Sequence, residues 1–282
     1  MRLARRTFLA AGAATIVLPR LARAEVNALS FGGSTEQGGL VIGKAPAGAA
    51  VSVDGAAVRL SPQGNFVFGF SYDRIEPAHV VALYADGGSE ARDVAPIPRQ
   101  YETQSIEGLP QELVTPSPEN LERIKRENAL ITEARTRDSG GTGFAGPFDW
   151  PFPGIVTGVY GSRRIENGTP MAPHLGVDIA APEGTPIRAP ADAIVSLTGD
   201  FLVNGGFTQL DHGHGVSSCY LHQSERMVKA GDKVARGDVI GLVGKTGRAT
   251  GPHTHWGLAW FQVKLDPSRS TRSPVPPVPP KP

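Results

Sequence analysis

Short apolar runs separated by glycines and prolines dominate the first hundred residues. Val51 and Val53 alternate with polar neighbours before Asp54-Gly55, and Val58 and Leu60 alternate after it. This pattern predicts a β-hairpin with a two-residue turn. The stretch NFVFGF repeats phenylalanine at every second position and predicts another strand. Residues 25–100 are therefore expected to form a β-rich accessory domain, built as a small sandwich.

The pattern changes to helical spacing at residues 117–137. Leu121, Ile124 and Ile131 recur at helical intervals, Ser117 can cap the helix, and Pro118 suits its first position. DSGGTG at residues 138–143 has the composition of a flexible linker. Residues 101–147 are thus expected to be a helical connector and linker, a strut between domains. Docking of a partner protein is the alternative role for the helix.

Residues 148–267 alternate again, with glycines at close intervals and no helical stretch, and predict a second β domain. Residues 268–282 contain the proline-rich run SPVPPVPPKP and are expected to be an extended, disordered tail. The sequence therefore predicts a mainly β protein with one connecting helix.

The first 24 residues are expected to be a signal peptide rather than part of the fold. Arginines precede an apolar run from Phe8 to Leu18, and the segment ends Ala22-Arg23-Ala24. The run is too short to span a bilayer, so we expect an exported protein with no membrane span. Arg5-Arg6 followed by Thr-Phe-Leu resembles the twin-arginine export signal, and a general secretory signal is the alternative.

The charge balance argues against a nucleic-acid partner. Residues 1–24 hold five arginines and no acidic residue, so the formal charge falls from +1 to −4 without them. Cys219 is the single cysteine, which excludes an intramolecular disulfide, and its apolar surroundings predict a buried strand thiol. Any metal ligands must therefore be histidines and carboxylates.

Histidines are concentrated in the second β region. Six of the seven fall between positions 174 and 255. His174 and Asp178 stand four apart, and His253 and His255 stand two apart. Residues two apart on a strand face the same side, so His253 and His255 can reach one ion or substrate, with Trp256 on the reverse side. By the same alternation His222 is expected to share a face with Tyr220. Each pattern alone is a weak signal.

Together these residues meet the requirements of a catalytic zinc site. Such a site needs three protein ligands and one open position for water. His174, Asp178 and one histidine of the H-x-H pair would supply the three ligands. The other histidine and His222 would remain beside the open position as proton acceptors or charge stabilisers.

HLGVD, YLH and GRATGPHTHWG occur here in the order typical of the M23 (lysostaphin-like, LytM-type) peptidoglycan endopeptidases. The resemblance covers roughly residues 151–267 and includes YGSRR at 160–164 and VKAGDKVARGDVIGLVGKTG at 228–247. It implies an antiparallel β domain of the duplicated hybrid motif type with a groove. By resemblance, the sequence implies one Zn²⁺ per chain and the following site residues: zinc ligands His174, Asp178 and His255, and catalytic histidines His222 and His253.

The departures from the family pattern are Tyr160, Thr254 and Gln223, where phenylalanine, leucine and leucine are usual. None falls on an expected ligand. Two further histidines, His212 and His214, lie among glycines and are expected to be structural or turn residues.

The expected function is that of an exported, periplasmic zinc metallopeptidase. The resemblance implies that its substrate is the peptide stems of peptidoglycan and that the expected bond is the D-alanyl–diaminopimelyl cross-link. Arg163 and Arg248 could meet carboxylates of the wall peptide, or be ordinary solvated charges. The alternative is a non-catalytic regulator that binds the wall or activates a peptidoglycan amidase. Because a regulator needs no intact site, the five retained residues favour the enzyme.

Overall fold

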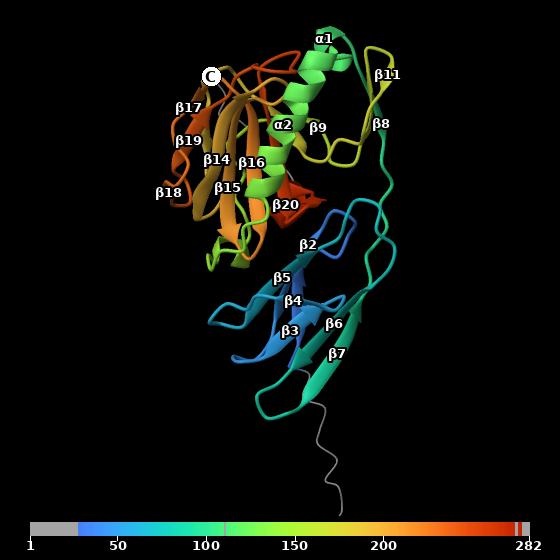
Figure 1. Ribbon diagram of the computed structural model, residues 1–282, viewed down its shortest axis with the longest axis vertical. Helices are drawn as coiled ribbons and strands as arrows, with labels where there is room; N and C mark the ends of the chain where they lie inside the picture. The colour runs from blue at the N-terminus through green and yellow to red at the C-terminus, as the bar shows by residue number, and fades with distance from the viewer. Residues whose placement is uncertain (1–27, 110, 274–275, 278–282) are drawn as a thin grey trace, which may run out of the picture.

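The computed structural model of the chain describes residues 28–109, 111–273 and 276–277. Figure 1 shows N-terminal strands forming one β body and a larger β body above it, with helix α2 (Pro118–Ala134) along its side. The prediction of a mainly β fold is confirmed. The signal peptide expected at residues 1–24 lies outside the described residues. In the described ranges, no helix has the length and apolar character to cross a membrane.

The N-terminal strands form two antiparallel sheets that face one another. One sheet has the order β1-β2-β5 and the other β4-β3-β6-β7. Their bounds are Ser30–Gly33 (β1), Leu40–Lys44 (β2), Ala50–Val53 (β3), Ala56–Val58 (β4), Asn65–Gly69 (β5), Ala78–Leu83 (β6) and Ser89–Val94 (β7). Val41, Phe66 and Phe68 of the first sheet share a buried core with Val51 and Val80 of the second. This is the expected small sandwich.

The predicted hairpin is present as β3 and β4. Val51 lies opposite Val58 in the antiparallel register. Asp54 and Gly55 both adopt left-handed backbone angles, with φ of 51° and 80°. Such angles at both central positions match the right-handed twist of the strands, which is why Asp-Gly favours this turn.

The larger body is built on an eight-stranded sheet. Its order is β18-β14-β15-β16-β20-β12-β9, and β21 pairs with β20. A smaller sheet has the order β13-β19-β17. The bounds are Ile155–Gly158 (β9), Val177–Ala180 (β12), Pro186–Arg188 (β13), Ala193–Phe201 (β14), Gly205–Gly213 (β15), Val216–Gln223 (β16), Glu225–Arg226 (β17), Lys233–Val234 (β18), Val239–Leu242 (β19), His253–Trp260 (β20) and Val263–Leu265 (β21).

Two neighbouring strands of this sheet, β12 and β20, direct alternate side chains into the apolar core and into a pocket on the other face. On β12, Val177 and Ile179 enter the apolar core, while Asp178 points to the other face. On β20, Trp256 is fully buried in the same core, and His253 and His255 line a pocket on the opposite face. The strand alternation predicted for these histidines and for Trp256 is confirmed.

The connector, expected to be only a strut between domains, pairs with strands of the larger body. Its strand β8 (Thr103–Ile106) pairs in parallel with β10 (Arg163–Glu166), which also pairs with β11 (Thr169–Pro170). A short helix α1 (Gln111–Val114) follows. The predicted helix is present as α2, and Ser117 Oγ accepts a hydrogen bond from the Asn120 amide at 3.2 Å.

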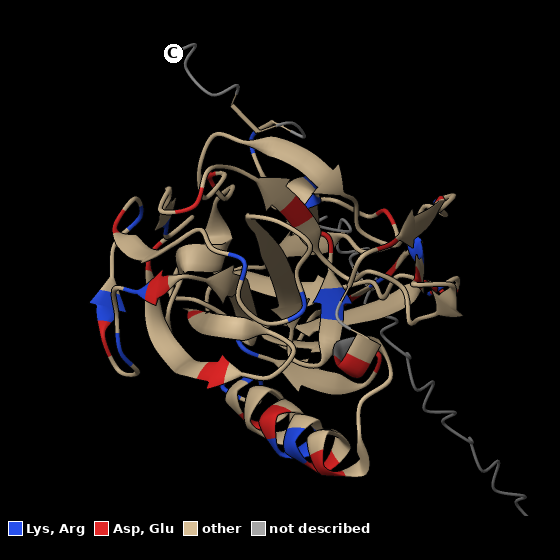
Figure 2. Ribbon diagram, turned by 90° about the horizontal axis from the view of Figure 1, so that it is seen from above, with Lys and Arg blue, Asp and Glu red and all other residues tan. Residues whose placement is uncertain are grey.

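Helix α2 lies beside the sheet and carries both signs of charge, as Figure 2 shows. Its single buried residue is Ile131, which packs with Phe201, Phe207 and Cys219. The helix therefore docks through a small apolar contact, because most of its surface is polar.

Two segments expected to lack order are held by hydrogen bonds. In the expected flexible linker, the carbonyl of Ser139 accepts from the His214 amide at 2.9 Å, and a 3-10 turn, η1 (Gly143–Ala145), ends the segment. In the expected disordered tail, a second 3-10 turn, η2 (Pro267–Ser270), accepts a hydrogen bond at the Ser270 carbonyl from the Phe148 amide at 2.8 Å. Local composition missed these contacts because their partners are distant in sequence.

Candidate active site

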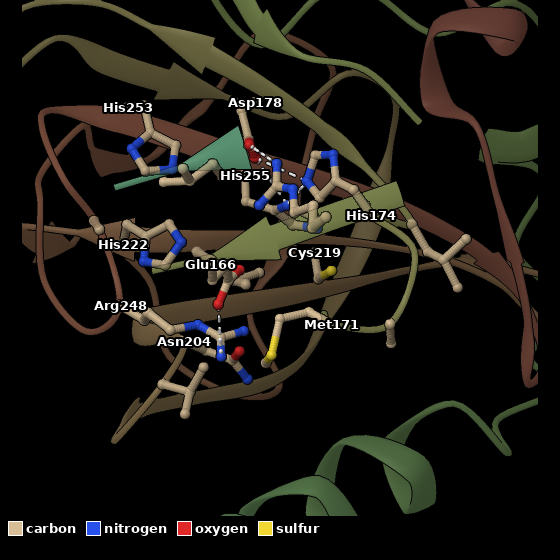
Figure 3. Close-up of a pocket in the computed structure, with 18 of the residues that line it drawn as sticks. Glu166, Met171, His174, Asp178, Asn204, Cys219, His222, Arg248, His253 and His255 are labelled. Carbon is tan, nitrogen blue, oxygen red and sulfur yellow. Dashed lines mark hydrogen bonds and ion pairs between the residues drawn. The ribbon is translucent and has the colours of Figure 1, made fainter. Parts of the chain in front are cut away.

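Three predicted ligands meet at one point of the pocket. His255 Nδ1 lies 2.8 Å from His174 Nε2 and 3.0 Å from Asp178 Oδ1, and His174 Nε2 lies 3.0 Å from the same carboxylate oxygen. Figure 3 shows the three side chains pointing toward one another. In the described part of the chain, these residues form a group of potential ligand atoms within 4.8 Å of one another.

The strands explain this convergence. Asp178 and His255 are direct cross-strand partners in the antiparallel pair of β12 and β20, so their side chains lie side by side. His174 comes from the loop before β12. That loop runs tightly against β20, since a Cβ at Gly176 would lie 2.8 Å from the Trp256 carbonyl oxygen. A glycine at this position lets the loop bring His174 to the other two residues.

The ionisation of the group suits a metal. Burial alone would raise the pKa of Asp178, but its contacts with His174 and His255 hold it well below its usual value. Burial lowers the pKa of His255 to about 4. One carboxylate and neutral imidazoles are the forms that bind a metal ion.

The donor set and its spacing fit Zn²⁺. Two imidazole nitrogens and one carboxylate oxygen are common zinc ligands at 2.0–2.2 Å, which separates tetrahedral ligands by roughly 3.3 Å. The observed separations of 2.8–3.0 Å are close to that value. His174 Nδ1 lies 3.1 Å from the Val159 carbonyl, so its hydrogen is on Nδ1 and Nε2 keeps the lone pair.

A second histidine pair faces this group across the pocket. The rings of His222 and His253 have centroids 4.7 Å apart. His222 Nδ1 lies 2.8 Å from the Thr246 carbonyl, and His253 Nδ1 lies 2.8 Å from the Gly251 carbonyl. Since a carbonyl only accepts, each ring donates from Nδ1 and carries its lone pair on Nε2. Burial, and then the neighbouring His253, lower the pKa of His222 to about 3.

The expectation that His222 shares a face with Tyr220 is wrong. Tyr220 is fully buried in the apolar core, whereas His222 lines the pocket. The register of β15 and β16 shifts so that Phe207 stands opposite two residues, Leu221 and His222. Such a bulge breaks the alternation and re-aims a side chain. His222 also adopts a φ of 65°, a strained value for a residue with a side chain.

Two charged contacts at the site were not identified from the sequence. Arg164 binds the second oxygen of Asp178 through Nη2. Glu166, two residues further along β10, pairs with Arg248 at 3.2 Å. Strand alternation places Arg164 and Glu166 on one face, which is the available signal. Arg163, the neighbouring arginine considered as a contact of the wall peptide, is exposed.

His212, His214 and Cys219 lie on β15, β16 or the turn between them and are not part of the ligand group. His212 is buried and its Nε2 lies 2.8 Å from Ser218 Oγ, while His214 occupies the β15–β16 turn with a φ of 51°. Neither belongs to the three-residue ligand group, in line with the structural role expected for them. Cys219 is a buried thiol on β16, as expected, and borders the pocket.

The pocket has a volume of about 530 Å³ and is lined by more than the second β region. Gln104 and Ile106 of β8 and Asn128, Ile131 and Arg135 of α2 also border it. The connector therefore forms a wall of the candidate site.

Known proteins match the chain over this region. The profile of Peptidase family M23 matches residues 172–267, which hold all five candidate site residues. Peptidoglycan DD-endopeptidase ShyA of Vibrio cholerae is 41% identical over 104 residues, covering 36% of this chain and 24% of that protein. DD-carboxypeptidase/endopeptidase Mpg of Neisseria meningitidis is 45% identical over 83 residues, covering 29% of this chain and 19% of that protein. The matches thus span about a quarter or less of these curated relatives.

A solved structure matches nearly the whole chain. The crystal structure of a peptidase assigned to family M23 from Pseudomonas aeruginosa is 31% identical, with a TM-score of 0.64. The match covers 84% of this chain and 94% of that one. With both the profile and this near-complete structural relative pointing the same way, the chain belongs to the M23 peptidase family.

Proposed function

We propose that this chain is an exported, zinc-dependent peptidoglycan endopeptidase that cuts peptide cross-links between D-alanine and diaminopimelate. The convergence of His174 Nε2, Asp178 Oδ1 and His255 Nδ1 opposite the His222–His253 pair carries the proposal. The names of the curated relatives, which include peptidoglycan DD-endopeptidases, support the substrate class. The signal-like residues 1–24 support export to the periplasm.

In this proposal the three ligands hold one Zn²⁺. A bound zinc ion supplies Lewis-acid activation of water and of the scissile carbonyl. Asp178 contributes the single negative charge among the ligands, and Arg164 fixes that carboxylate through its second oxygen. The ligand group thus has a defined orientation before substrate binds.

The two other histidines act on the water through Nε2, His253 by moving a proton and His222 by orienting the water. His253 takes the proton of the attacking water at Nε2, because its Nδ1 hydrogen is held by the Gly251 carbonyl. The resulting imidazolium then donates that proton to the leaving amine. His222 has a pKa near 3, so it stays neutral and orients the water by accepting a hydrogen bond at Nε2.

We also propose the domain division at residues 25–100, 101–147 and 148–267, with the last segment as the peptidase domain. Its support is the match of the M23 profile to residues 172–267 and the position of all five site residues within it.

Digestion of purified sacculi tests the function. The mature protein is incubated with sacculi, with and without a chelator, and the new peptide ends are identified by mass. We expect cleavage between D-alanine and diaminopimelate, lost with chelator and restored by zinc. Intact sacculi together with a protein that holds no zinc would support the alternative, a non-catalytic regulator.

A further inference from the structure

An ion pair that the proposed mechanism does not use lies in the same pocket as the histidines. Arg248 Nη1 is 3.2 Å from Glu166 Oε2, and both residues line the pocket. Figure 3 shows the pair on the His222 side of the pocket, across from His174. The Glu166 side chain is 3% exposed, whereas the Arg248 side chain is 25% exposed. The carboxylate is therefore the buried partner, and the guanidinium is the one that substrate can reach.

Each partner is held by rigid backbone. Glu166 lies on β10, between Ile106 of β8 and Thr169 of β11. The Arg248 amide donates to the Val203 carbonyl at 2.8 Å. The same loop supplies the Thr246 carbonyl that holds His222 Nδ1. Arg248 is thus anchored two residues from the group that orients a proposed catalytic histidine.

The Glu166–Arg248 ion pair is not expected to add much to the stability of the fold. Taking two charges out of water costs several kcal/mol per ion, and apolar residues often replace a buried ion pair without loss. A guanidinium fixed by a buried carboxylate is, however, a good receptor for a second carboxylate, because its planar donors match carboxylate geometry. Glu166 also balances its charge, which weakens the non-specific attraction of anions and leaves donor geometry to select the ligand.

We infer that Arg248, oriented by Glu166, binds a free carboxylate of the substrate residue next to the scissile bond. The inference rests on the proposed function and narrows its substrate class. The enzyme would prefer a cross-link whose diaminopimelyl residue carries a free carboxylate over one in which that carboxylate is amidated. Arg248 is thus a specificity residue and Glu166 a positioning residue.

Two synthetic cross-linked peptide dimers test this inference. They are identical except that the diaminopimelyl carboxylate beside the scissile bond is free in one and amidated in the other. A charge-assisted hydrogen bond contributes enough for roughly a 10- to 100-fold preference in kcat/KM for the acid by the wild-type protein. Arg248→Gln should lose that preference, mainly through a higher KM for the acid, and cut the amide about as well as the wild type.

Controls separate recognition from folding. Arg163→Gln makes the same change at an exposed arginine of the same strand as Glu166 and should keep the preference. Glu166→Gln and Arg248→Lys should each reduce the preference without abolishing it. Melting temperature and zinc content show whether Arg248→Gln folds. If it does not fold, Arg248→Lys is used as the test variant in its place.

The outcomes distinguish the two proposals. Wild-type protein that cuts both dimers equally would overturn this inference and leave the proposed function standing. A loss of the same size on both dimers in Arg248→Gln would also overturn it. Wild-type protein that cuts neither dimer would contradict the proposed function, and the inference would fall with it.

Discussion

At the residue scale, backbone carbonyls decide which nitrogen of each histidine is available. The Val159 carbonyl holds Nδ1 of His174, so that ring presents Nε2 to the ligand group. The Thr246 and Gly251 carbonyls do the same for His222 and His253. His255 instead turns Nδ1 toward Asp178. The two histidines of the H-x-H motif are therefore chemically different, although the motif alone makes them look equivalent.

This difference predicts unequal effects of two matched substitutions. His255→Ala should lose bound zinc, because it removes one of three ligand atoms. His253→Ala should retain zinc but lose roughly 100-fold or more in kcat, the range expected for removing a general base. Zinc content after dialysis and hydrolysis of a cross-linked dimer are the two measurements. Equal zinc loss in both variants would contradict the assignment.

Arg164 contacts a proposed metal ligand, and we expect this contact to strengthen zinc binding. Its guanidinium binds the Asp178 oxygen that faces away from the histidines, so it orients the carboxylate. Such partners typically change metal affinity 10- to 100-fold. Arg164→Gln should therefore weaken zinc binding by roughly that factor, measured by competition with a chelating dye. Arg163→Gln is the matched control and should bind zinc as the wild type does, and an unchanged affinity in Arg164→Gln would refute the role.

The sequence predicted the ligand side chains of the candidate site better than the charged residues that hold them in place. His174, Asp178 and His255 could be proposed because ligand chemistry restricts which residue types matter. Arg164 and Glu166 could not, since arginine and glutamate on a strand are ordinary surface residues until a partner from a distant strand is known. A contact of Arg248 with a wall-peptide carboxylate could be proposed from the sequence, but its orientation by Glu166, 82 positions away, could not.

At the element scale, a single buried residue docks α2 against the sheet. Ile131 packs with Phe201, Phe207 and Cys219, and the rest of the helix contributes polar contacts such as Glu127 Oε2 accepting from the Leu202 amide at 2.9 Å. Ile131 also lines the pocket. The helix that closes one side of the site is therefore weakly attached.

Shortening this residue should release the helix. Ile131→Ala removes the main apolar contact and should weaken docking by about 2 kcal/mol, near the lower end for such core truncations. Amide hydrogen exchange across residues 118–134 should rise accordingly, while zinc content stays constant. Leu130→Ala changes the neighbouring residue, which is 47% exposed, and should leave exchange near the wild-type level. Equal exchange in the two variants would show that Ile131 does not anchor α2.

Elements defined by local patterns were predicted, and those defined by distant pairing were not. The α2 helix and the β3–β4 hairpin follow from a cap, spacing and an Asp-Gly turn. The parallel pairing of β8 with β10 joins segments about 60 residues apart, so no local signal marks it. The bulge at His222 depends on its register with β15, which alternation on one strand cannot reveal.

At the scale of the whole molecule, the N-terminal sandwich and the larger body share buried contacts. Leu40 and Val67 of the sandwich belong to the core of the larger body. Arg99 Nη1 pairs with Asp266 Oδ2 at 2.8 Å, and the Asp266 amide donates to the Gly38 carbonyl at 2.7 Å. These contacts predict that the two bodies unfold together, since exposing this interface leaves apolar and charged groups without partners.

The Arg99–Asp266 pair offers a quantitative test of this coupling. The Asp266 side chain is 2% exposed, so Arg99→Met would leave a buried carboxylate without its cation and should cost about 3 kcal/mol. Arg269→Met is the matched control, because Arg269 and Glu36 also join the two bodies but are 36% and 31% exposed. This half-exposed pair is partly screened by solvent and contributes about 1 kcal/mol or less, so the control should change little. Denaturant unfolding followed by tryptophan fluorescence measures both variants. A single transition that shifts only in Arg99→Met would support one cooperative unit, whereas two separate transitions in the wild type would contradict it.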